Sequence, residues 1–431
     1  MKRLKLDKQI LAWAMYDWAN SSFATTVLAG FFPLFFKEYW SVGIDGARST
    51  FYLGTGNAIA SLLIVLTAPL LGSIADSGSL RKRFLFLFTI TGVLATAALS
   101  GIAKGEWLVA VMAFVVATIG FMGANVFYDA LLVTVAKQED WDVVSALGYA
   151  LGYLGGGLLF AINVGMTLSP ESFGLKDTSA AVQLSFVTVA VWWFIFSMPL
   201  MLLVKEKRVP TAMTGLEVVK AGYVQLLETF QHVRIYRVAS IFLIAYWLYI
   251  DGLDTIVRMA VDYGLSIGLE QKDLITALLI TQFVGFPAAL GFGVLAKKLG
   301  KGGEGARRGI LLGLLIYIVV TVFAYSMNSS KEFYALAVTI GLVQGGVQAL
   351  SRSLYARLIP TSRAAEFFGF YNMLGKFAAV VGPLMVGGVS LATGNHRLGI
   401  LSIIVLFILG AWLLTRVNVV AGEQAVKKAD A

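Results

Sequence analysis

Apolar runs separated by short polar connections extend along this sequence from residue 10 to residue 417. A helix needs about 20 residues to cross the roughly 30 Å of hydrocarbon in a bilayer, and twelve runs have about that length. They are 10–36, 51–74, 84–103, 107–136, 144–168, 181–204, 238–263, 274–296, 309–327, 333–358, 367–392 and 398–417. Open strands would leave backbone groups unpaired in lipid, and barrel strands would be shorter and alternating. The pattern therefore predicts an all-α integral membrane protein with twelve transmembrane helices.

Basic residues gather on alternate connections between these runs. The cluster from Arg81 to Arg83 and the pair Arg307 and Arg308 fall on the same side as the N-terminus. The opposite side carries isolated residues such as Lys37. Short cytoplasmic loops are enriched in Lys and Arg, so both termini are predicted to be cytoplasmic. The net charge of +9 is then explained by basic loops that face the anionic lipid of the cytoplasmic surface. We therefore expect no nucleic-acid partner.

The longest cytoplasmic connection divides the chain into two halves. We predict an N-terminal six-helix bundle over 1–204, a linker over 205–237 and a C-terminal six-helix bundle over 238–431. Apolar linker residues share a helical stripe opposite Glu217, Lys220 and Glu228, which predicts an amphipathic helix on the membrane surface or against a protein partner. The stripe comprises Leu216, Val219, Tyr223, Leu226, Leu227, Phe230 and Val233.

The connection between the second and third spans has a counterpart in the second half. Asp76 shortly precedes Arg81 on the cytoplasmic edge, and this pattern resembles the loop signature of the major facilitator superfamily. The resemblance implies two pseudo-symmetric six-helix bundles with a substrate site near the midplane. In the second half Lys297 stands where an acid would be, so only the first copy is expected to act as a charged latch. The alternative is that the basic residues merely set the topology.

Charged and amide side chains inside the spans are the strongest functional signal. A charge at membrane depth costs several kcal/mol, so it needs a partner, a cavity or a neutralising proton. Spans one, four, seven and ten carry most of these residues, and in a bundle of four three-helix repeats those spans would line a central cavity. The spacing within each span places the side chains on one face. They are Asp17 and Asn20; Asn125 and Asp129; Asp251, Asp254 and Arg258; Gln344, Gln348 and Arg352; and, in the eleventh span, Asn372 and Lys376.

The depths of these residues predict two charge locks. Asp129 and Arg352 both lie about 10 Å from the cytoplasmic edge, and they would close that side, with Lys376 as a further candidate partner. Asp254 and Arg258 would help to close the opposite side. The alternative is a static pair within one half.

Asp17 is the first candidate for a coupling proton and Asp251 is the second, because a buried carboxylate can exchange protons as its cavity changes sides. Either could instead hold Na⁺ or pair with Lys376, and Asp17 could merely hydrogen-bond the nearby backbone. For a zwitterionic solute, Arg352 or Lys376 would meet a carboxylate, and Asp17 or Asp251 an amine. Neutral hydrogen bonds would come from Asn20, Asn125, Gln344 and Gln348.

Other chemistries lack a signal. The chain has no cysteine and two histidines, His232 and His396, far apart in sequence, so we expect no metal site and no cofactor. It lacks a nucleotide-binding loop and a Ser-His-Asp set, which speaks against an enzyme or an ATP-driven pump. Glycines of the fifth span, among them Gly148 and Gly152, predict close helix packing. We expect a monomer in the lipid bilayer.

Two stretches carry a likeness to a known family. One is the run from Tyr16 through Asp17 and Asn20 to Ser21. The other comprises Gln344 to Ser353, Glu366 to Tyr371, Gly375, Lys376, Gly382 and Pro383. They resemble the unknown major facilitator family, which includes the fungal autophagy-related vacuolar effluxer, and the likeness covers essentially the whole chain. The resemblance implies a twelve-helix secondary transporter, and the fungal members are similar to exporters of amino acids. For a bacterial-looking chain we expect the cytoplasmic (inner) membrane.

The leading prediction is a secondary active transporter that works by alternating access, coupled to protons or Na⁺. Its substrate would be a small polar or zwitterionic solute such as an amino acid. A second prediction is an exporter or flippase of an amphiphile or lipid. A third, from another class, is a non-transporting receptor or sensor, which would not need polar stripes in four symmetry-related helices.

Overall fold

The computed structural model describes residues 7–206, 215–231, 236–266 and 268–429. Within these residues, 12 helices are long and apolar enough to cross a membrane. The prediction of twelve transmembrane helices is therefore confirmed. Several spans are longer than the apolar runs suggested, because polar residues at each end continue the helix, as in the first span from Lys8 to Trp40.

Six spans make up the first half. The first is α1 (Lys8–Ser22), the π-helix η1 (Phe23–Phe31), α2 (Phe32–Phe35) and the π-helix η2 (Phe36–Trp40) in continuous succession. The others are α3 (Gly46–Gly78), α4 (Arg81–Ala98), α5 (Trp107–Ala130) followed by α6 (Leu132–Val135), α7 (Trp141–Leu168) and α8 (Thr178–Leu203).

Six further spans make up the second half. They are α10 (Arg237–Ser266), α11 (Gln271–Leu299), α12 (Gly303–Ser326), α13 (Ser330–Arg357), α14 (Ala364–Thr393), and α15 (His396–Ser402) followed by α16 (Ile404–Thr415). The helix α9 (Gly215–Gln231) lies between the halves in sequence, and α17 (Val419–Ala429) follows the last span.

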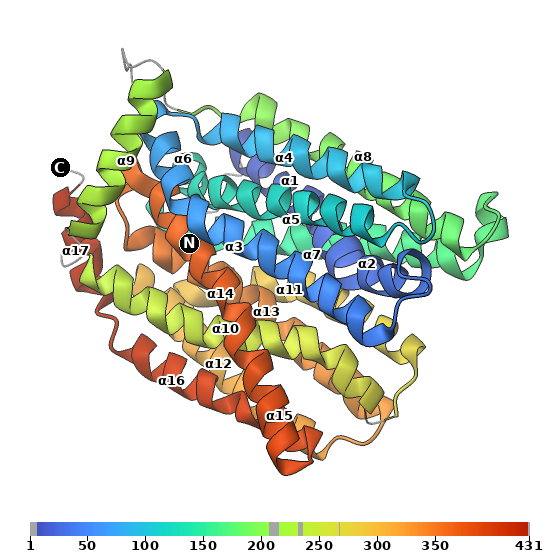
Figure 1. Cartoon of the computed structure of the whole chain (residues 1–431). Helices are drawn as coiled ribbons and strands as arrows, with labels where there is room; N and C mark the ends of the chain where they lie inside the picture. The colour runs from blue at the N-terminus through green and yellow to red at the C-terminus, as the bar shows by residue number, and fades with distance from the viewer. Residues whose placement is uncertain (1–6, 207–214, 232–235, 267, 430–431) are drawn as a thin grey trace.

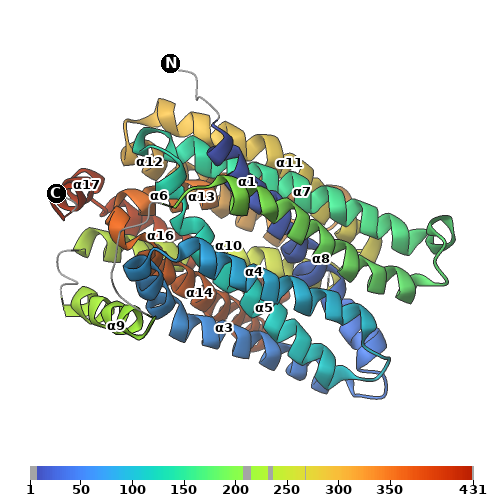
Figure 2. The ribbon, with the colours of Figure 1, turned by 90° about the horizontal axis from the view of Figure 1, so that it is seen from above.

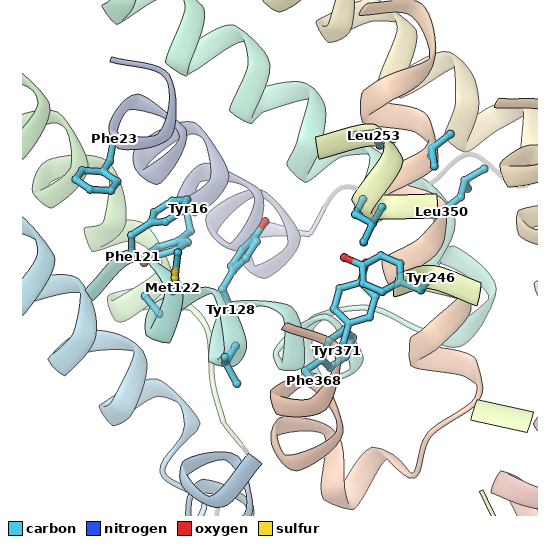
Figure 3. Packing of buried hydrophobic residues seen from close by; sticks show 14 of the residues in the cluster. Tyr16, Phe23, Phe121, Met122, Tyr128, Tyr246, Leu253, Leu350, Phe368 and Tyr371 are labelled. Carbon is cyan, nitrogen blue, oxygen red and sulfur yellow. The ribbon is translucent and has the colours of Figure 1, made fainter. Parts of the chain in front are cut away.

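Large side chains are buried within both halves and belong to one continuous hydrophobic cluster. Figure 3 shows one group around Tyr16, Phe23 and Phe121 and another group around Tyr246 and Tyr371. Small residues bring helices close: a Cβ on Gly120 of α5 would lie 2.4 Å from the Gly92 nitrogen of α4. The cavity between the halves is thus bounded by two internally packed bundles.

The halves meet through a few helices. In the first half α3 and α5 pack against α14, and α7 packs against α11 and α13. The helices α9 and α17 lie at the same end of the molecule (Figure 1), as does the start of α1, where the Lys205 nitrogen donates to the Gln9 side chain. We call this the linker end and the opposite one the far end; Figure 2 shows α9 there beside α3.

Candidate functional site

A cavity of about 280 Å³ lies between the two halves. Its walls come from α1, η1, α5 and α7 on one side and from α10, α11, α13 and α14 on the other. Most of the polar residues that the sequence singled out line it: Asp17, Asn20, Asn125, Asp129, Asp254, Gln348, Arg352, Asn372 and Lys376. The Asn20 and Asn125 side chains are joined directly, with Asn20 Nδ2 donating to Asn125 Oδ1 at 2.6 Å. Spans one, four, seven and ten all contribute, as predicted.

Arg352 of the second half inserts its guanidinium into the first half. Its Nη1 lies 3.0 Å from Asp129 Oδ1 and 3.6 Å from Asp17 Oδ2. Its Nε donates to the Ser145 hydroxyl at 2.9 Å, and its Nη2 donates to the Ser145 carbonyl at 2.9 Å. Only 2% of the side chain is exposed. The pair of Arg352 and Asp129 therefore joins the two halves rather than lying within one.

Aromatic rings of the first half surround the same guanidinium. The Arg352 Cζ lies 4.9 Å from the Trp13 ring centre, 5.3 Å from that of Tyr128 and 4.4 Å from that of Tyr149. A cation over desolvated aromatic faces gains about 2 kcal/mol or more in favourable cases. Trp13 is fixed in turn, because its Nε1 donates to the Tyr128 carbonyl at 2.9 Å. The first half thus provides a receptacle for one cation.

The two carboxylates beside Arg352 have further partners. Tyr128 donates its hydroxyl proton to Asp17 Oδ2 at 3.0 Å, and Asn372 Nδ2 donates to Asp129 Oδ2 at 3.0 Å. Asn372 belongs to the second half, so Asp129 contacts that half through two residues. We call Asp17, Asp129, Arg352 and Tyr128 the Arg352 cluster.

Gly148 of α7 lets this cluster come together. A Cβ there would lie 2.8 Å from the Tyr128 hydroxyl, 2.9 Å from Asp17 Oδ2 and 3.0 Å from Arg352 Nη2. The sequence predicted helix packing for the fifth-span glycines, and Gly155 does pack, against Trp18 of α1. Gly148 in addition leaves room for the charged groups.

The predicted latch at Asp76 and Arg81 also joins the halves. Arg81 Nε lies 2.6 Å from Asp76 Oδ1, and Arg81 Nη2 donates to the carbonyls of Thr361 and Ser362. Asp76 accepts the backbone N–H groups of Ala365 and Glu366, at 3.1 and 2.9 Å. An anion at a helix N-terminus satisfies free N–H groups and the positive end of the helix dipole. The first-half loop therefore caps α14.

Two further ion pairs between the halves were not predicted from the sequence. Arg357 Nη2 lies 3.1 Å from Asp142 Oδ2, with both side chains buried. Lys297 Nζ lies 3.0 Å from Asp140 Oδ1, and these side chains are partly exposed. Asp140, Asp142 and Arg357 fall at span ends, where a charge is ordinary, so the sequence gave no reason to single them out. Of the bridges described so far, those of Arg352 lie in the cavity wall, whereas those of Arg81, Arg357 and Lys297 lie outside its lining, near the ends of the spans.

Two of the predicted site residues, Asp251 and Gln344, do not line the cavity, and a third, Arg258, has a side chain outside the described part of the chain. Asp251 is not among the cavity-lining residues; its Oδ1 accepts the Gly382 N–H of α14 at 2.9 Å, and the Thr255 hydroxyl is 3.4 Å away. Gln344 lines a separate, small and mainly apolar pocket between α10, α11 and α13. The Arg258 side chain lies outside the described part of the chain, so its proposed lock with Asp254 stays a prediction.

Sequence reasoning missed several neutral residues of the site. Tyr149 and Tyr153 of α7 and Gln282 of α11 line the cavity, and Ser145 binds Arg352. The two tyrosines are four residues apart and follow Gly148, so a polar stripe on α7 was present in the sequence. This stripe is a weak signal, because tyrosine in a transmembrane helix is as common in packing as in a binding site.

Comparison with known proteins finds sequence relatives that cover nearly the whole chain. The family model described as "Vacuole effluxer Atg22 like" matches residues 41–142 and 133–427. The MFS-type transporter YxiO of Bacillus subtilis is 38% identical over 420 residues, covering 96% of this chain and 95% of the relative. Autophagy-related protein 22 of Saccharomyces cerevisiae is 22% identical, covering 98% of this chain and 94% of that protein.

Solved structures of low sequence identity share the fold. The human organic anion transporter MFSD10 (TETRAN) superposes with a TM-score of 0.68 at 14% identity, covering 94% of this chain and 99% of that one. The proton:xylose symporter XylE gives a TM-score of 0.67 at 12% identity, covering 95% and 94%. The predicted fold class, a major facilitator fold of two six-helix bundles, is confirmed.

Proposed function

Because the chain belongs to the Atg22-like family of major facilitator transporters, we propose that it is a secondary active transporter of a small zwitterionic solute, coupled to a proton. The membership makes it an integral membrane transporter. The solute, the coupling ion and the direction of transport are our proposals. They rest on the cavity and on the charges that line it.

The charges of the cavity wall carry the proposal. Asp17, Asp129 and Asp254 face Arg352 and Lys376 across one space of about 280 Å³. With all five ionised, the wall has one negative charge in excess, which is costly in a site shielded from water. A bound proton removes that excess, whereas a zwitterion leaves it unchanged. The arrangement therefore favours uptake of one proton together with a neutral or zwitterionic solute.

The size and polarity of the cavity restrict the solute. Drug-sized ligands occupy pockets of about 300–1,000 Å³, so a cavity at the lower limit suits a molecule of amino-acid size. We propose that Lys376 meets its carboxylate and Asp254 its amine, with Gln348, Asn20 and Asn125 as neutral partners. Asp17 carries the proton in this proposal, since its carboxylate lies farther from the Arg352 guanidinium, at 3.6 Å, than that of Asp129, at 3.0 Å, and also lines the open space.

Alternating access requires the halves to separate at the linker end. Arg352 would then leave its aromatic receptacle, and Asp129 and Asp17 would lose their guanidinium partner. Protonation of Asp17 weakens its attraction to Arg352 and so favours this separation. In this way the proton, the charge lock and the access of the cavity are linked. We further propose that the linker end faces the cytoplasm, as the distribution of basic residues predicts.

A second candidate, transport of an amphiphile, is favoured by one observation. The small apolar pocket that contains Gln344 shares Gln282 with the cavity wall. An apolar tail could extend from the cavity into this pocket if the intervening side chains moved. The same experiment separates the two candidates.

Flux into proteoliposomes tests the proposal. The purified protein is supplied with a panel of amino acids and amphiphiles, with and without an imposed proton gradient. We expect a gradient to drive accumulation of one or more amino acids, and Asp17→Asn to abolish accumulation while leaving exchange of solute across the membrane. Asp251→Asn is the matched control, because that carboxylate lies outside the cavity lining. Transport whose rate and extent change neither with the proton gradient nor with the Asp17 substitution would reject proton coupling through Asp17.

A further inference from the structure

The linker helix α9 presents three different faces. Val218, Gly222, Gln225 and Thr229 form the face that packs on the bundle. A Cβ on Gly222 would lie 2.8 Å from the Ile74 backbone, and the Ser73 hydroxyl donates to the Gly222 carbonyl at 2.8 Å. The predicted apolar stripe contains none of these residues, because Gln225 and Thr229 are polar, Gly222 is glycine and Val218 lies outside the stripe.

The second face of α9 is apolar and exposed. Val219, Tyr223 and Leu227 follow each other at intervals of four residues, so they form one row along the helix. Their exposed fractions are 44%, 54% and 42%. They belong to the stripe predicted from the sequence. Leu226 of that stripe is partly buried, and the side chains of Leu216, Phe230 and Val233 lie outside the described part of the chain. The third face carries the exposed residues Glu217, Val224 and Glu228, and Lys220 lies at its border with the apolar row, seven residues before Leu227.

The position of α9 along the bundle places it at the level of the lipid headgroups. It rests on Ser73 and Ile74, about 12 Å beyond Leu66, an exposed apolar residue of the same helix α3. Arg81, which begins α4, follows Ile74 by seven residues and belongs to the basic cluster expected at the cytoplasmic surface. The helix α9 runs across the end of the spans rather than along them (Figure 1).

From these observations we infer that the row Val219, Tyr223 and Leu227 is a docking surface for the lipid bilayer. A helix that lies in the interface buries an apolar face by about 5–10 Å and keeps its charged face in water. The three faces of α9 match the three environments at this corner of the molecule: protein, lipid and water. A second copy of the chain would cover the apolar row without requiring the charged face to point to solvent.

Membrane docking would act on the contact between the halves. Gln225 Nε2 donates to Glu366 Oε2 of α14 at 2.6 Å, while the Ser77 hydroxyl of α3 donates to Gln225 Oε1 at 3.2 Å. Arg363 Nη2 lies 3.3 Å from Glu228 Oε2 of α9. The helix α9 therefore crosses the junction of α3 and α14 and contacts both helices. In this proposal the bilayer contacts the outer side of α9.

Site-directed spin labelling tests the inference in the full-length protein. The chain has no cysteine, so single cysteines can be introduced without removing native ones. Nitroxides are attached to Y223C and L227C on the apolar row and to E217C and E228C on the charged face. The protein is reconstituted in vesicles of phosphatidylethanolamine and phosphatidylglycerol. Collision rates are measured with oxygen, which concentrates in lipid, and with a water-soluble nickel complex.

We expect a ratio of oxygen to nickel collisions several-fold higher at positions 223 and 227 than at 217 and 228. Equal and high nickel accessibility at all four positions would overturn the inference, since the apolar row would then face water. Low accessibility to both reagents at 223 and 227 would also overturn it, because protein would then cover the row. Unchanged solute flux of the labelled proteins shows that they are folded, and failure of lipid docking leaves the proposed transport function untouched.

Discussion

Two loops occupy equivalent places in the two halves, yet they join the halves in different ways. The α3–α4 loop is flanked by Asp76 and Arg81, which are almost fully shielded from water and bind the backbone at and just before the start of α14. The α11–α12 loop uses Lys297, whose pair with Asp140 remains about one-third exposed. A buried charge that loses its partner is strongly destabilising, whereas an exposed pair contributes little. Of the two loops, the first should therefore contribute more to closure of the linker end.

Removing the first-half anion should have the largest effect on stability. Asp76→Ala leaves the Arg81 guanidinium buried without its carboxylate and leaves two N–H groups of α14 without an acceptor. We expect a loss of about 3–5 kcal/mol of stability for such an uncompensated buried charge. The midpoint of thermal unfolding in detergent measures it. A shift no larger than that of Lys297→Gln would contradict the larger contribution proposed for the first loop.

Filling the space at Gly148 should have an intermediate effect. Gly148→Ala places a methyl group against Tyr128, Asp17 and Arg352, and overpacking of this kind costs about 1–3 kcal/mol. We expect reduced stability and altered coupling of transport to the proton gradient. Gly165→Ala on the same helix is the control, because a Cβ there meets no atom within 4 Å. Equal behaviour of the two variants would show that Gly148 does not shape the cluster.

Breaking the ion pair between Lys297 and Asp140 should have the smallest effect. For Lys297→Gln we expect a loss of about 0–1 kcal/mol, as is usual for exposed pairs. The effect should shrink further at high salt, because screening weakens exposed charges. Thermal unfolding at low and high ionic strength provides the measurement. A large, salt-independent loss would mean that the two loops contribute alike.

The sequence was most informative where charge meets lipid. The spans followed from apolar length, and the link between Asp129 and Arg352 followed from the expense of isolated charges at equal depth. Depth and sequence spacing alone do not determine direction around a helix within a bundle, so Asp251 was assigned to the cavity although it binds the α14 backbone. Tyr149, Ser145 and Gln282 cost little to bury, and their role depends on tertiary contacts.

The linker helix shows the same limit. Its apolar stripe suggested which face would seek an apolar environment, but the face that packs on α3 is formed around Gly222 and Gln225. Small size at one position and a matching hydrogen-bond partner at another determine that contact. Neither property appears in a hydrophobic pattern. The π-helix η1 beside the cavity was likewise not predicted, because its apolar residues also suit an α-helix.

The central claim is that Arg352 holds the linker end closed and must leave its receptacle when that end opens. Distances between spin labels at R83C and K301C report on the linker end, and those between K104C and K331C report on the far end. We predict that Arg352→Gln shifts the population toward longer linker-end distances and shorter far-end distances, while Arg416→Gln, at an exposed site, changes neither. Unchanged distance distributions in the Arg352 variant, with the protein folded, would contradict the account.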